Sequence, residues 1–384
     1  MERIVIATEI APQYFGGLAA YARLLAASLS NAGISGSFVS ALGTRQDLSQ
    51  NPEPLPWPLR VIGNPSRWNG FWRPLYKRMA SRPLTHALLE RAIRAALPAS
   101  TVTKAAGSAD VLHFIGTGWD FSGFAFLHAA RRMGARFTVY PAIHPSQWGD
   151  DAIDIRLYRQ ADFVFCQSNC EKNHLERLGV PSEKLLCTFL PPMCRTDGLG
   201  SRLRSALEVG NRPTALFLGR RDEGKGYPAL LRAWIEVLQK IPEAVLVLAG
   251  PGDPHAAALE QIPPGSLRDL GVPDERTKAD ALAACDVFCL PSAHESFGIV
   301  YVEAWSYGKP VICGTASASR ELVEDGITGL WADQNPRVLA GHLVTLLADG
   351  KMGKRLGNAG LSLQRSRYTN EAMVRVHLHA FGMN

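Results

Sequence analysis

The sequence predicts an α/β fold made of two doubly wound domains. The chain has 384 residues, more than a single core usually spans, so two domains are expected. Apolar residues make up 46% and charged residues 20%, which can fill two cores and excludes a disordered chain. Short β-branched apolar runs alternate with longer helical stretches, which is the pattern of parallel sheets, and this alternation occurs twice.

Six candidate strands occupy the first half of the chain. They are RIVIAT (3–8), GSFVSA (36–41), DVLHFI (110–115), RFTVYP (136–141), DFVFCQ (162–167) and KLLCTFL (184–190). Residues 191–213 then lack a sustained apolar period and are predicted to form the linker. We therefore expect an N-terminal domain over residues 1–195.

The second half repeats the pattern. Its candidate strands are TALFLG (214–219), AVLVLAG (244–250), DVFCLP (286–291), PVICG (310–314) and a short GLW near 329. They predict a C-terminal domain over residues 196–369, followed by an amphipathic helix over 370–384 that packs back on the first domain. Two facing domains of this kind leave a cleft at the carboxyl ends of their strands, where open α/β sheets bind ligands.

The apolar and cysteine patterns bear on the location of the protein. No stretch approaches the ~18 apolar residues of a membrane span, and the first apolar run is too short for a signal peptide. We expect a cytoplasmic protein, with peripheral contact to the inner face of a membrane left open. The seven cysteines lie mostly in apolar runs, as reduced buried thiols do. Zinc binding by Cys166 with Cys170, or Cys285 with Cys289, is disfavoured because each pair begins in a strand-like run.

Positive charge is concentrated in one window. The net charge is +6, while residues 55–104 hold nine basic residues and one acid, 9 − 1 = +8. This favours a local anionic partner over nucleic-acid binding. Within residues 64–94, aromatic side chains alternate with arginines, so Trp68, Trp72, Arg78 and Arg82 are candidates for contact with an acceptor or an anionic membrane. The alternative is a loop and helix whose aromatics pack inward.

The most informative segment is HESFGIVYVEAWSYGKPVI, residues 294–312. Glu295 and Glu303 lie on either side of seven residues, and the strand-to-helix turn between them contains Ser296, Phe297 and Gly298. Amide groups at a helix start bind anions, and Glu303 lies about two turns further on the same side. The layout suits a ligand whose phosphates are flanked by two sugars. A helix with one capping and one solvated acid is the alternative.

Two further segments point to phosphate binding. In TALFLGRRDEGKGYPALLRAW, residues 214–234, Arg220 and Lys225 follow a strand end and can converge on a diphosphate. Arg221 is either a substitute for them or a solvated surface charge. In PQYFGGLAAYARLLAASL, residues 12–29, Gly16 and Gly17 precede a helix, but the dehydrogenase fingerprint G-x-G-x-x-G is absent.

These segments resemble the family 4 glycosyltransferases of the GT-B fold, in which two Rossmann-like domains face each other across a cleft. The resemblance implies that the N-terminal domain binds the acceptor and that the C-terminal domain binds the nucleotide sugar. The resemblance rests on Glu-x7-Glu, the SFG turn and GR…KG, and is most secure over residues 214–331. It implies the following roles: donor-sugar binding by Glu295, diphosphate binding by the amides of Phe297, Gly298 and Ile299, ribose binding by Glu303, and neutralisation of the leaving diphosphate by Arg220 and Lys225. The loop with Gly16 and Gly17 would approach the donor phosphate and the acceptor.

Two histidines compete for the catalytic position. His144 follows the strand RFTVYP and matches the histidine of the family at the end of that strand. His113 lies inside DVLHFI, where a core or wall role is more common, so His144 is preferred. The resemblance also implies retention of anomeric configuration, with the leaving phosphate assisting attack on the same face, so we assign no enzymic nucleophile.

The sequence departs from the family pattern at residues 191–193, where Pro-Pro-Met replaces an Asn-Gly-Val-Asp-like turn, and at 305–307, where Trp-Ser-Tyr replaces small residues. Because of these departures, the substrate of a close relative cannot simply be assigned to this chain. No two Asp residues are separated by one residue, so the Asp-x-Asp metal site of the other major glycosyltransferase fold is missing. We expect no metal and no other cofactor, with Arg220, Lys225 and helix-start amides in the charge role.

The prediction is a retaining, metal-independent hexosyltransferase that uses a nucleoside diphosphate sugar and a hydroxyl acceptor, with no nucleic-acid partner. The acceptor can be a glycan, a lipid-linked molecule or a small molecule, and an anionic acceptor remains open. The nucleobase is expected along SLRDLGVPDE, residues 266–275. The alternatives are a nucleotide-sugar epimerase of similar fold and a catalytically silent sugar-nucleotide binding protein.

Overall fold

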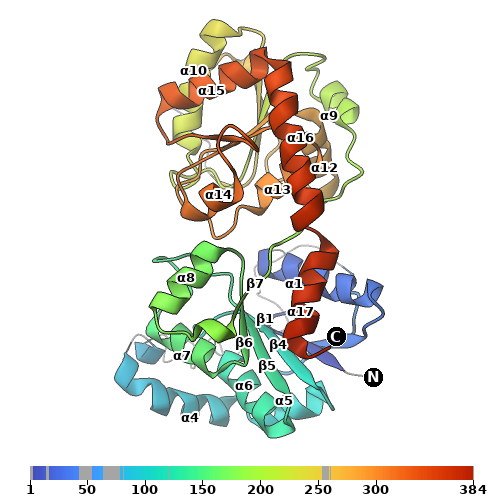
Figure 1. Cartoon of the computed structure of the whole chain (residues 1–384), viewed down its shortest axis with the longest axis vertical. Coiled ribbons are helices and arrows are strands. Elements are labelled where there is room, and N and C mark those ends of the chain that lie inside the picture. The colour runs from blue at the N-terminus through green and yellow to red at the C-terminus, as the bar shows by residue number, and fades with distance from the viewer. Residues whose placement is uncertain are drawn as a thin grey trace. The chain divides into compact units, whose positions relative to one another are not determined.

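The computed structural model describes residues 3–13, 17–42, 54–63, 78–80, 82–120, 122–252, 259 and 261–383. The chain forms two compact units, an N-terminal unit of Met1–Phe189 with Asn370–Asn384 and a C-terminal unit of Leu190–Thr369 (Figure 1). Each unit contains one parallel sheet with helices around it, which confirms the predicted α/β class.

The units divide slightly before the predicted boundary after residue 195. The hydroxyl of Tyr307 donates to the carbonyl of Arg195 at 2.5 Å and accepts from the amide of Gly198 at 3.1 Å. Tyr307, a residue of the C-terminal unit, therefore holds the backbone at Arg195 and Gly198, just after the division between the units at Leu190.

Among the described residues, seven parallel strands form the N-terminal sheet, in the order β3-β2-β1-β4-β5-β6-β7. They are β1 (Ile4–Ile10), β2 (Gly36–Leu42), β3 (Leu59–Val61), β4 (Val111–Ile115), β5 (Arg136–Tyr140), β6 (Phe163–Cys166) and β7 (Leu185–Cys187). The central strands are fully buried, as expected for a sheet covered on both faces.

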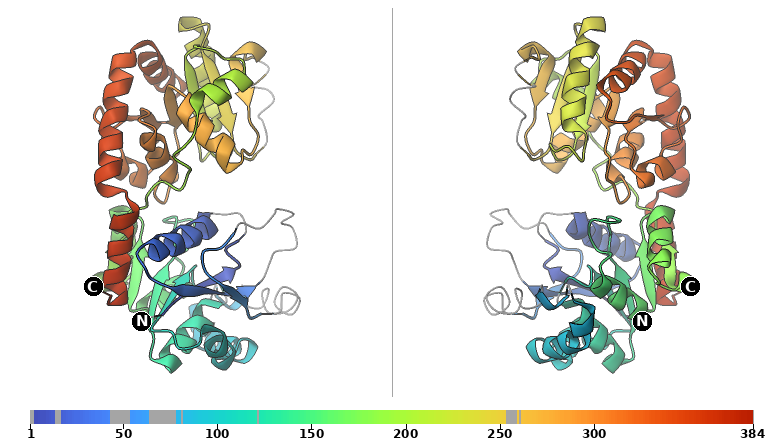
Figure 2. Two further views of the ribbon diagram at one scale, coloured as in Figure 1. Left: turned by 90° about the vertical axis from the view of Figure 1, so that its right-hand side faces the viewer. Right: turned by 90° about the vertical axis from the view of Figure 1, so that its left-hand side faces the viewer.

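Helices cover both faces of this sheet (Figure 2). They are α1 (Gly17–Asn31), α4 (His86–Ala96), α5 (Ala99–Ala106), α6 (Ser122–Met133), α7 (Ala152–Gln160), α8 (Asn169–Arg177) and α17 (Asn370–Phe381). Because side chains alternate along a strand, Leu112 and Phe114 of β4 enter the core under α4 to α6, while His113 enters the opposite core.

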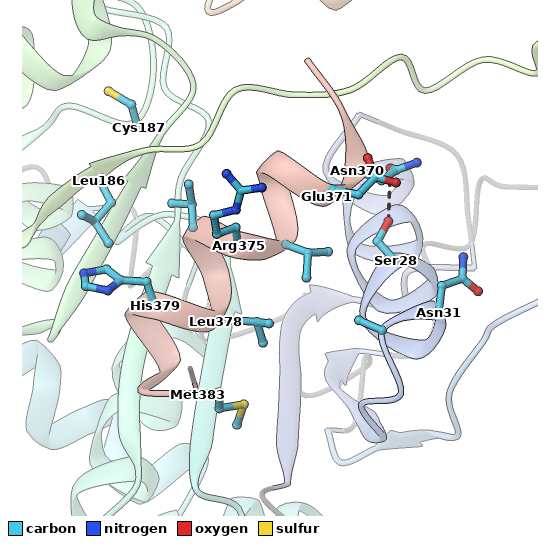
Figure 3. A pocket seen from close by; sticks show the side chains of 13 residues that line it. Ser28, Asn31, Leu186, Cys187, Asn370, Glu371, Arg375, Leu378, His379 and Met383 are labelled. Atoms are coloured by element: carbon cyan, nitrogen blue, oxygen red, sulfur yellow. Dashed lines mark hydrogen bonds between the residues drawn. The ribbon is translucent and has the colours of Figure 1, made fainter. Parts of the chain in front are cut away.

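The terminal helix α17 belongs to this N-terminal unit although it follows the C-terminal unit in sequence. His377 Nδ1 lies 2.8 Å from the carbonyl of Met373 and must donate to it, so Nε2 accepts from the Tyr21 hydroxyl of α1 at 2.6 Å. The His377 ring also stacks on Phe165 of β6, with centroids 4.1 Å apart. At the start of α17, Ser28 of α1 donates to Asn370 (Figure 3).

In the part of the C-terminal unit that the structure describes, six parallel strands form the sheet, in the order β10-β9-β8-β11-β12-β13. They are β8 (Thr214–Leu218), β9 (Val245–Ala249), β10 (Leu267–Asp269), β11 (Val287–Leu290), β12 (Val311–Cys313) and β13 (Leu330–Trp331). The order reverses direction between β8 and β11, and such a switch point is where open sheets bind ligands.

The helices of this unit are α9 (Gly200–Ala206), α10 (Tyr227–Lys240), α12 (Glu275–Ala284), α13 (Ile299–Ser306), α14 (Ser317–Leu322), α15 (Pro336–Ala348) and α16 (Gly350–Arg367). In both units, no helix of the described ranges is long and apolar enough to cross a membrane.

Candidate functional site

The main candidate site lies at the carboxyl ends of β8 and β11, where two turns meet. The turn after β8 leads into α10, and the turn after β11 leads into α13. The amide of Ala293 donates to the carbonyl of Gly224 at 2.8 Å, which joins the two turns. Gly226 at the start of α10 has φ +73°, and a Cβ there would lie 2.5 Å from the carbonyl oxygen of Pro291. Glycine therefore permits the close approach of the turns.

Lys225 and Glu295 meet across these turns. Lys225 Nζ lies 2.7 Å from Glu295 Oε1, and their side chains are 15% and 9% exposed. Lys225 Nζ also donates to the carbonyl of His294 at 3.3 Å. The structure thus brings together two of the predicted site residues, 70 positions apart in sequence, at the switch point of the sheet.

The two arginines after β8 have different environments. The Arg220 side chain is 69% exposed, and its Nε lies 3.4 Å from Asp222 Oδ2. Arg221 is buried, and its two terminal nitrogens donate to the carboxylate of Asp269 at the end of β10. These hydrogen bonds lower the pKa of Asp269. Both expectations for Arg221 are therefore wrong, because the guanidinium is neither solvated nor available to a phosphate.

The turn before α13 has the geometry expected of a helix start. Gly298 has φ +89°, and a Cβ at this position would lie 2.6 Å from the ring of Tyr301. Phe297 is buried, with its ring 5.8 Å from that of Tyr368. The backbone of Ser296 to Ile299 is thus fixed by packing, with the first helical residue at Ile299.

Glu303 is fully buried in α13. Its Oε1 accepts from Lys278 of α12 at 2.8 Å, while Oε2 has no hydrogen-bond partner within the described part of the chain. Burial raises the pKa of Glu303, against the opposing charge of Lys278. Burial alone would lower the pKa of Lys278, but the charges of Glu303 and Glu275 outweigh it and raise that pKa. The two groups form a buried ion pair.

His144 lies in a turn after β5 of the N-terminal unit and is half-buried. Its amide and carbonyl both bond to Trp148 at 2.9 Å, which closes a short hairpin. His113 is fully buried in β4, with Nδ1 2.8 Å from the Thr138 hydroxyl, and burial lowers its pKa well below the ordinary value. His113 is therefore a core residue.

The remaining predicted residues are placed as follows. Gly17 is the first residue of α1, and Arg78 and Arg82 are exposed before α4. Gly16, Trp68 and Trp72 lie outside the described residues. His144 and Gly17 belong to the N-terminal unit, whereas Arg220, Lys225, Glu295 and Glu303 belong to the C-terminal unit.

Sequence reasoning missed several partners of the site residues. Lys278 and Asp269 each bind a charged group of a distant turn or helix, and no local pattern marks them. Trp148 could have been found, because it follows His144 by four residues and lies in a Pro- and Gly-containing turn.

Comparisons with known proteins agree with this architecture. Residues 16–188 match the family model described as "Glycosyl transferase 4-like domain", and residues 212–349 match "Glycosyl transferases group 1". Each match falls within one of the two units.

Among characterised relatives, the GDP-mannose-dependent alpha-(1-6)-phosphatidylinositol monomannoside mannosyltransferase of Mycolicibacterium smegmatis is 30% identical over 261 residues, which cover 60% of this chain and 66% of that protein. The phosphatidyl-myo-inositol mannosyltransferase of Mycobacterium tuberculosis is 36% identical over 159 residues, 38% of this chain and 41% of that protein. The chain thus matches between about two fifths and two thirds of the length of these relatives.

Solved structures share the fold over the full length. The Anabaena protein HepE in complex with UDP superposes with a TM-score of 0.74 at 16% identity, over 100% of both chains. The two matched domains, the mannosyltransferase relatives and the shared two-unit fold lead to one conclusion. The chain belongs to the family 4 glycosyltransferases of the GT-B fold and is a glycosyltransferase.

Proposed function

We propose that the chain transfers a hexose from a nucleoside diphosphate sugar to a hydroxyl acceptor, with retention of anomeric configuration and without a metal ion. The observation that carries this proposal is the Lys225–Glu295 pair, largely buried at the switch point between β8 and β11. A cation and a carboxylate held 2.7 Å apart offer adjoining positions for a phosphate oxygen and a sugar hydroxyl. The pair therefore fits the junction between sugar and diphosphate in a donor.

Protein cations supply the charge balance in this mechanism. The leaving diphosphate gains negative charge as the glycosidic bond breaks, and preorganised donors stabilise that charge. Lys225 lies at the base of the site, and Arg220, on the same turn, extends into solvent where it can fold over the phosphates. The amides of Phe297, Gly298 and Ile299 add partial positive charge at the start of α13. These groups take the place of a metal held by Asp-x-Asp.

Glu303 would bind the ribose of the donor. Its Oε2 is a buried acceptor, and a ribose hydroxyl would be a suitable donor for it. Because the carboxylate is fully buried, a local rearrangement must open a path to it. The role of Glu295 differs, since its carboxylate would position the donor sugar next to the bond that breaks.

His144, a residue of the N-terminal unit, would act on the reacting groups of the substrates. It lies beyond the carboxyl end of β5, the edge of the sheet that places ligand-binding residues in α/β proteins. We assign it a contact with the transferred sugar or the acceptor hydroxyl. Retention follows if the acceptor attacks on the face from which the phosphate departs, and this needs no covalent intermediate on the enzyme.

The relatives suggest which donor to test first. The name of the M. smegmatis relative specifies GDP-mannose and a lipid-linked mannoside acceptor. We therefore propose GDP-mannose as the donor and a lipid-linked hydroxyl compound as the acceptor, with UDP sugars as the competing donors.

Product analysis tests this proposal directly. The protein is incubated in EDTA with GDP-mannose or UDP-glucose and a hydroxyl acceptor, and the anomeric configuration of the product is determined by NMR. We expect an α-glycoside from an α-linked donor. A β-glycoside contradicts retention, an epimerised sugar with free nucleotide indicates an epimerase, and donor binding without turnover indicates a silent binding protein. Activity that is lost in EDTA and restored by Mg²⁺ or Mn²⁺ contradicts metal independence.

A second proposal concerns the basic segment of the N-terminal unit, which we propose contacts an anionic membrane surface. Arg78 and Arg82 are exposed, and Leu84 is fully exposed directly before α4. Leu88 in the first turn of α4 is also exposed, so cationic and apolar side chains lie together. This combination is typical of an interfacial helix.

Vesicle sedimentation tests the membrane proposal. Wild type should bind phosphatidylglycerol vesicles in low salt and dissociate at high salt, because the attraction is electrostatic. The Arg78→Glu, Arg82→Glu double variant should bind severalfold less, whereas Arg232→Glu on α10 of the other unit should bind like wild type. Binding that ignores salt and the double substitution contradicts the proposal.

A further inference from the structure

The turn that carries His144 also fixes the position of Trp148. The amide of His144 donates to the carbonyl of Trp148, and the amide of Trp148 donates to the carbonyl of His144, both at 2.9 Å. The two residues are therefore a hydrogen-bonded antiparallel pair. In such a pair both side chains lie on the same face, with Cβ atoms about 4.5–5.5 Å apart. The side chains of His144 and Trp148 thus leave the turn on the same face.

The backbone of this turn is specifically shaped. The amide of Gln147 donates to the carbonyl of His144 at 2.9 Å, with Pro145 between them and Ser146 at φ +64°. This is the pattern of a type II turn, in which glycine usually occupies the position of Ser146. Ala142, just before the turn, also has a positive φ, +49°. Non-glycine residues in this region are costly and concentrate at functional sites.

Two buried side chains and one partly exposed side chain hold the turn in place. The carboxylate of Glu171, buried in α8, accepts from the amide of Ile143 at 3.1 Å. The hydroxyl of Tyr158, buried in α7, donates to the carbonyl of Gly149 at 2.9 Å. Asp150 accepts from the amide of Ser146 at 2.6 Å. The exposure of Trp148 is therefore imposed by the fold and does not come from a loose loop.

Trp148 differs from the other described tryptophans. Its side chain is 37% exposed, whereas Trp57, Trp234 and Trp305 are buried. Two other tryptophans are partly buried. The indole N–H of Trp119 donates to the carboxylate of Asp151, and that of Trp331 donates to the carbonyl of Val323. In contrast, the described residues provide no hydrogen-bond partner for the indole N–H of Trp148. The ring therefore offers an apolar face and an available donor together.

The charges nearby select the kind of ligand. Residues 137–155 contain no Lys or Arg, and Asp150 and Asp151 follow Trp148 closely. Asp150 pairs with His174 of α8 at 2.8 Å, and Asp151 accepts from the indole N–H of Trp119. A tryptophan that anchors a protein to an anionic membrane is normally accompanied by basic residues. Carboxylates instead accept hydrogen bonds from hydroxyl groups. The surroundings of Trp148 thus favour an uncharged ligand rich in hydroxyls over a phospholipid surface.

We propose that Trp148 is an acceptor-specificity residue, whose indole stacks on a hydroxylated ring, a pyranose or a cyclitol, on the face of the turn from which the side chain of His144 also projects. The proposal rests on the transferase function proposed above, which it extends by naming the acceptor class. A flat ring presents C–H groups to an indole face and hydroxyls to its N–H and to neighbouring carboxylates. An open-chain alcohol cannot cover the indole in this way.

Steady-state kinetics with three acceptors test the proposal. The acceptors are methyl α-mannopyranoside, myo-inositol and glycerol, and the variants are Trp148→Ala, Trp148→Phe and the control Leu178→Ala. Leu178 is similarly exposed, at 40%, in the same unit. For Trp148→Ala, we expect the KM of the ring acceptors to rise about tenfold with a smaller change in kcat, and the KM of glycerol to change less than about twofold. Trp148→Phe should recover most of the affinity.

Two further measurements separate this proposal from the function on which it rests. Hydrolysis of the donor without acceptor should be the same in wild type and in the control Leu178→Ala, and it reports the transferase function independently of any acceptor. Titrations followed by saturation-transfer NMR should show that Trp148→Ala binds methyl α-mannopyranoside about tenfold more weakly than wild type. If wild type neither transfers nor hydrolyses any donor, the transferase proposal fails, and the NMR result alone decides whether Trp148 binds rings.

Several outcomes would overturn the proposal. One is a ring-acceptor KM for Trp148→Ala within about twofold of wild type. Another is an equal loss for glycerol and the rings, which would indicate a distorted turn. A third is unchanged use of soluble rings with reduced vesicle binding, which would make Trp148 a membrane contact.

Discussion

Substitution of Glu303 by Gln separates a structural role from a ligand-binding role at the second glutamate. The change keeps the shape of the side chain but removes the charge that neutralises Lys278, 2.8 Å away. Breaking a buried ion pair by removing one partner typically costs about 3–5 kcal/mol. The lower part of this range is expected here, because Lys278 is 18% exposed and can turn toward water. For a unit of this size that corresponds to a decrease in Tm of roughly 6–12 °C.

Addition of Lys278→Met removes the unpaired charge. Because a buried pair replaced by apolar or neutral groups of similar volume is often close to neutral, the double variant should regain stability to within about 1 kcal/mol of wild type. Affinity for nucleotide should not recover in the same way. A hydrogen bond between a ribose hydroxyl and a carboxylate contributes about 1.5–3 kcal/mol, so the double variant should bind nucleotide about 10- to 100-fold more weakly than wild type.

The assay combines urea unfolding with calorimetric titration of GDP and of UDP, for wild type, both single variants and the double variant. Recovery of stability without recovery of nucleotide affinity supports the ribose contact. If the double variant binds nucleotide like wild type, Glu303 is a structural residue and the ribose assignment is refuted. If Glu303→Gln alone leaves the unfolding free energy unchanged, the argument from the buried ion pair is refuted.

Three other predictions follow from the charges and histidines. Arg220→Ala and Lys225→Ala should each lower kcat/KM by about 10- to 100-fold while the wild-type rate survives EDTA, and a loss below threefold in either variant would contradict their phosphate role. His144→Ala should reduce turnover much more than donor affinity, whereas His113→Ala should lower thermal stability. If His144→Ala keeps near-native turnover and His113→Ala loses it, the assignment of the catalytic histidine is reversed. Burial lowers the pKa of His377 to about 4, so its contribution to stability is complete above about pH 6.5 and is lost as the pH falls toward 4. In urea unfolding, the stability advantage of wild type over His377→Gln should therefore shrink by up to about 3 kcal/mol over that interval, and a constant difference would contradict the sign.

Much of the fold could be predicted because the central strands are long apolar runs. The predicted segment GSFVSA at 36–41 became β2, Gly36–Leu42, and TALFLG at 214–219 became β8, Thr214–Leu218. The edge strands β3 and β10 were missed. Each has three residues and is only partly buried, so neither produces a continuous hydrophobic signal.

Only the site residues that lie in local sequence motifs could be predicted. Glu295 and Lys225 lie in recognisable turns, and the parallel topology brings those turns together. The partners of Arg221 and Glu303 depend on strand order and helix packing, which no short motif contains. For this reason the sequence predicts Arg221 to be a substitute phosphate ligand or a solvated surface charge, whereas the structure pairs it with Asp269.

The return of α17 to the N-terminal unit has a consequence for synthesis of the chain. Residues 190–369 are complete, and can fold, before Asn370–Phe381 leave the ribosome. Until then, Tyr21 lacks its His377 partner and Phe165 lacks the ring that stacks on it. The surface around Tyr21 and Phe165 therefore stays uncovered by α17, exposed to solvent or bound by a chaperone, until the whole second unit has been translated. Nascent chains stalled before residue 370 should be much more prone to aggregation than those released after residue 381.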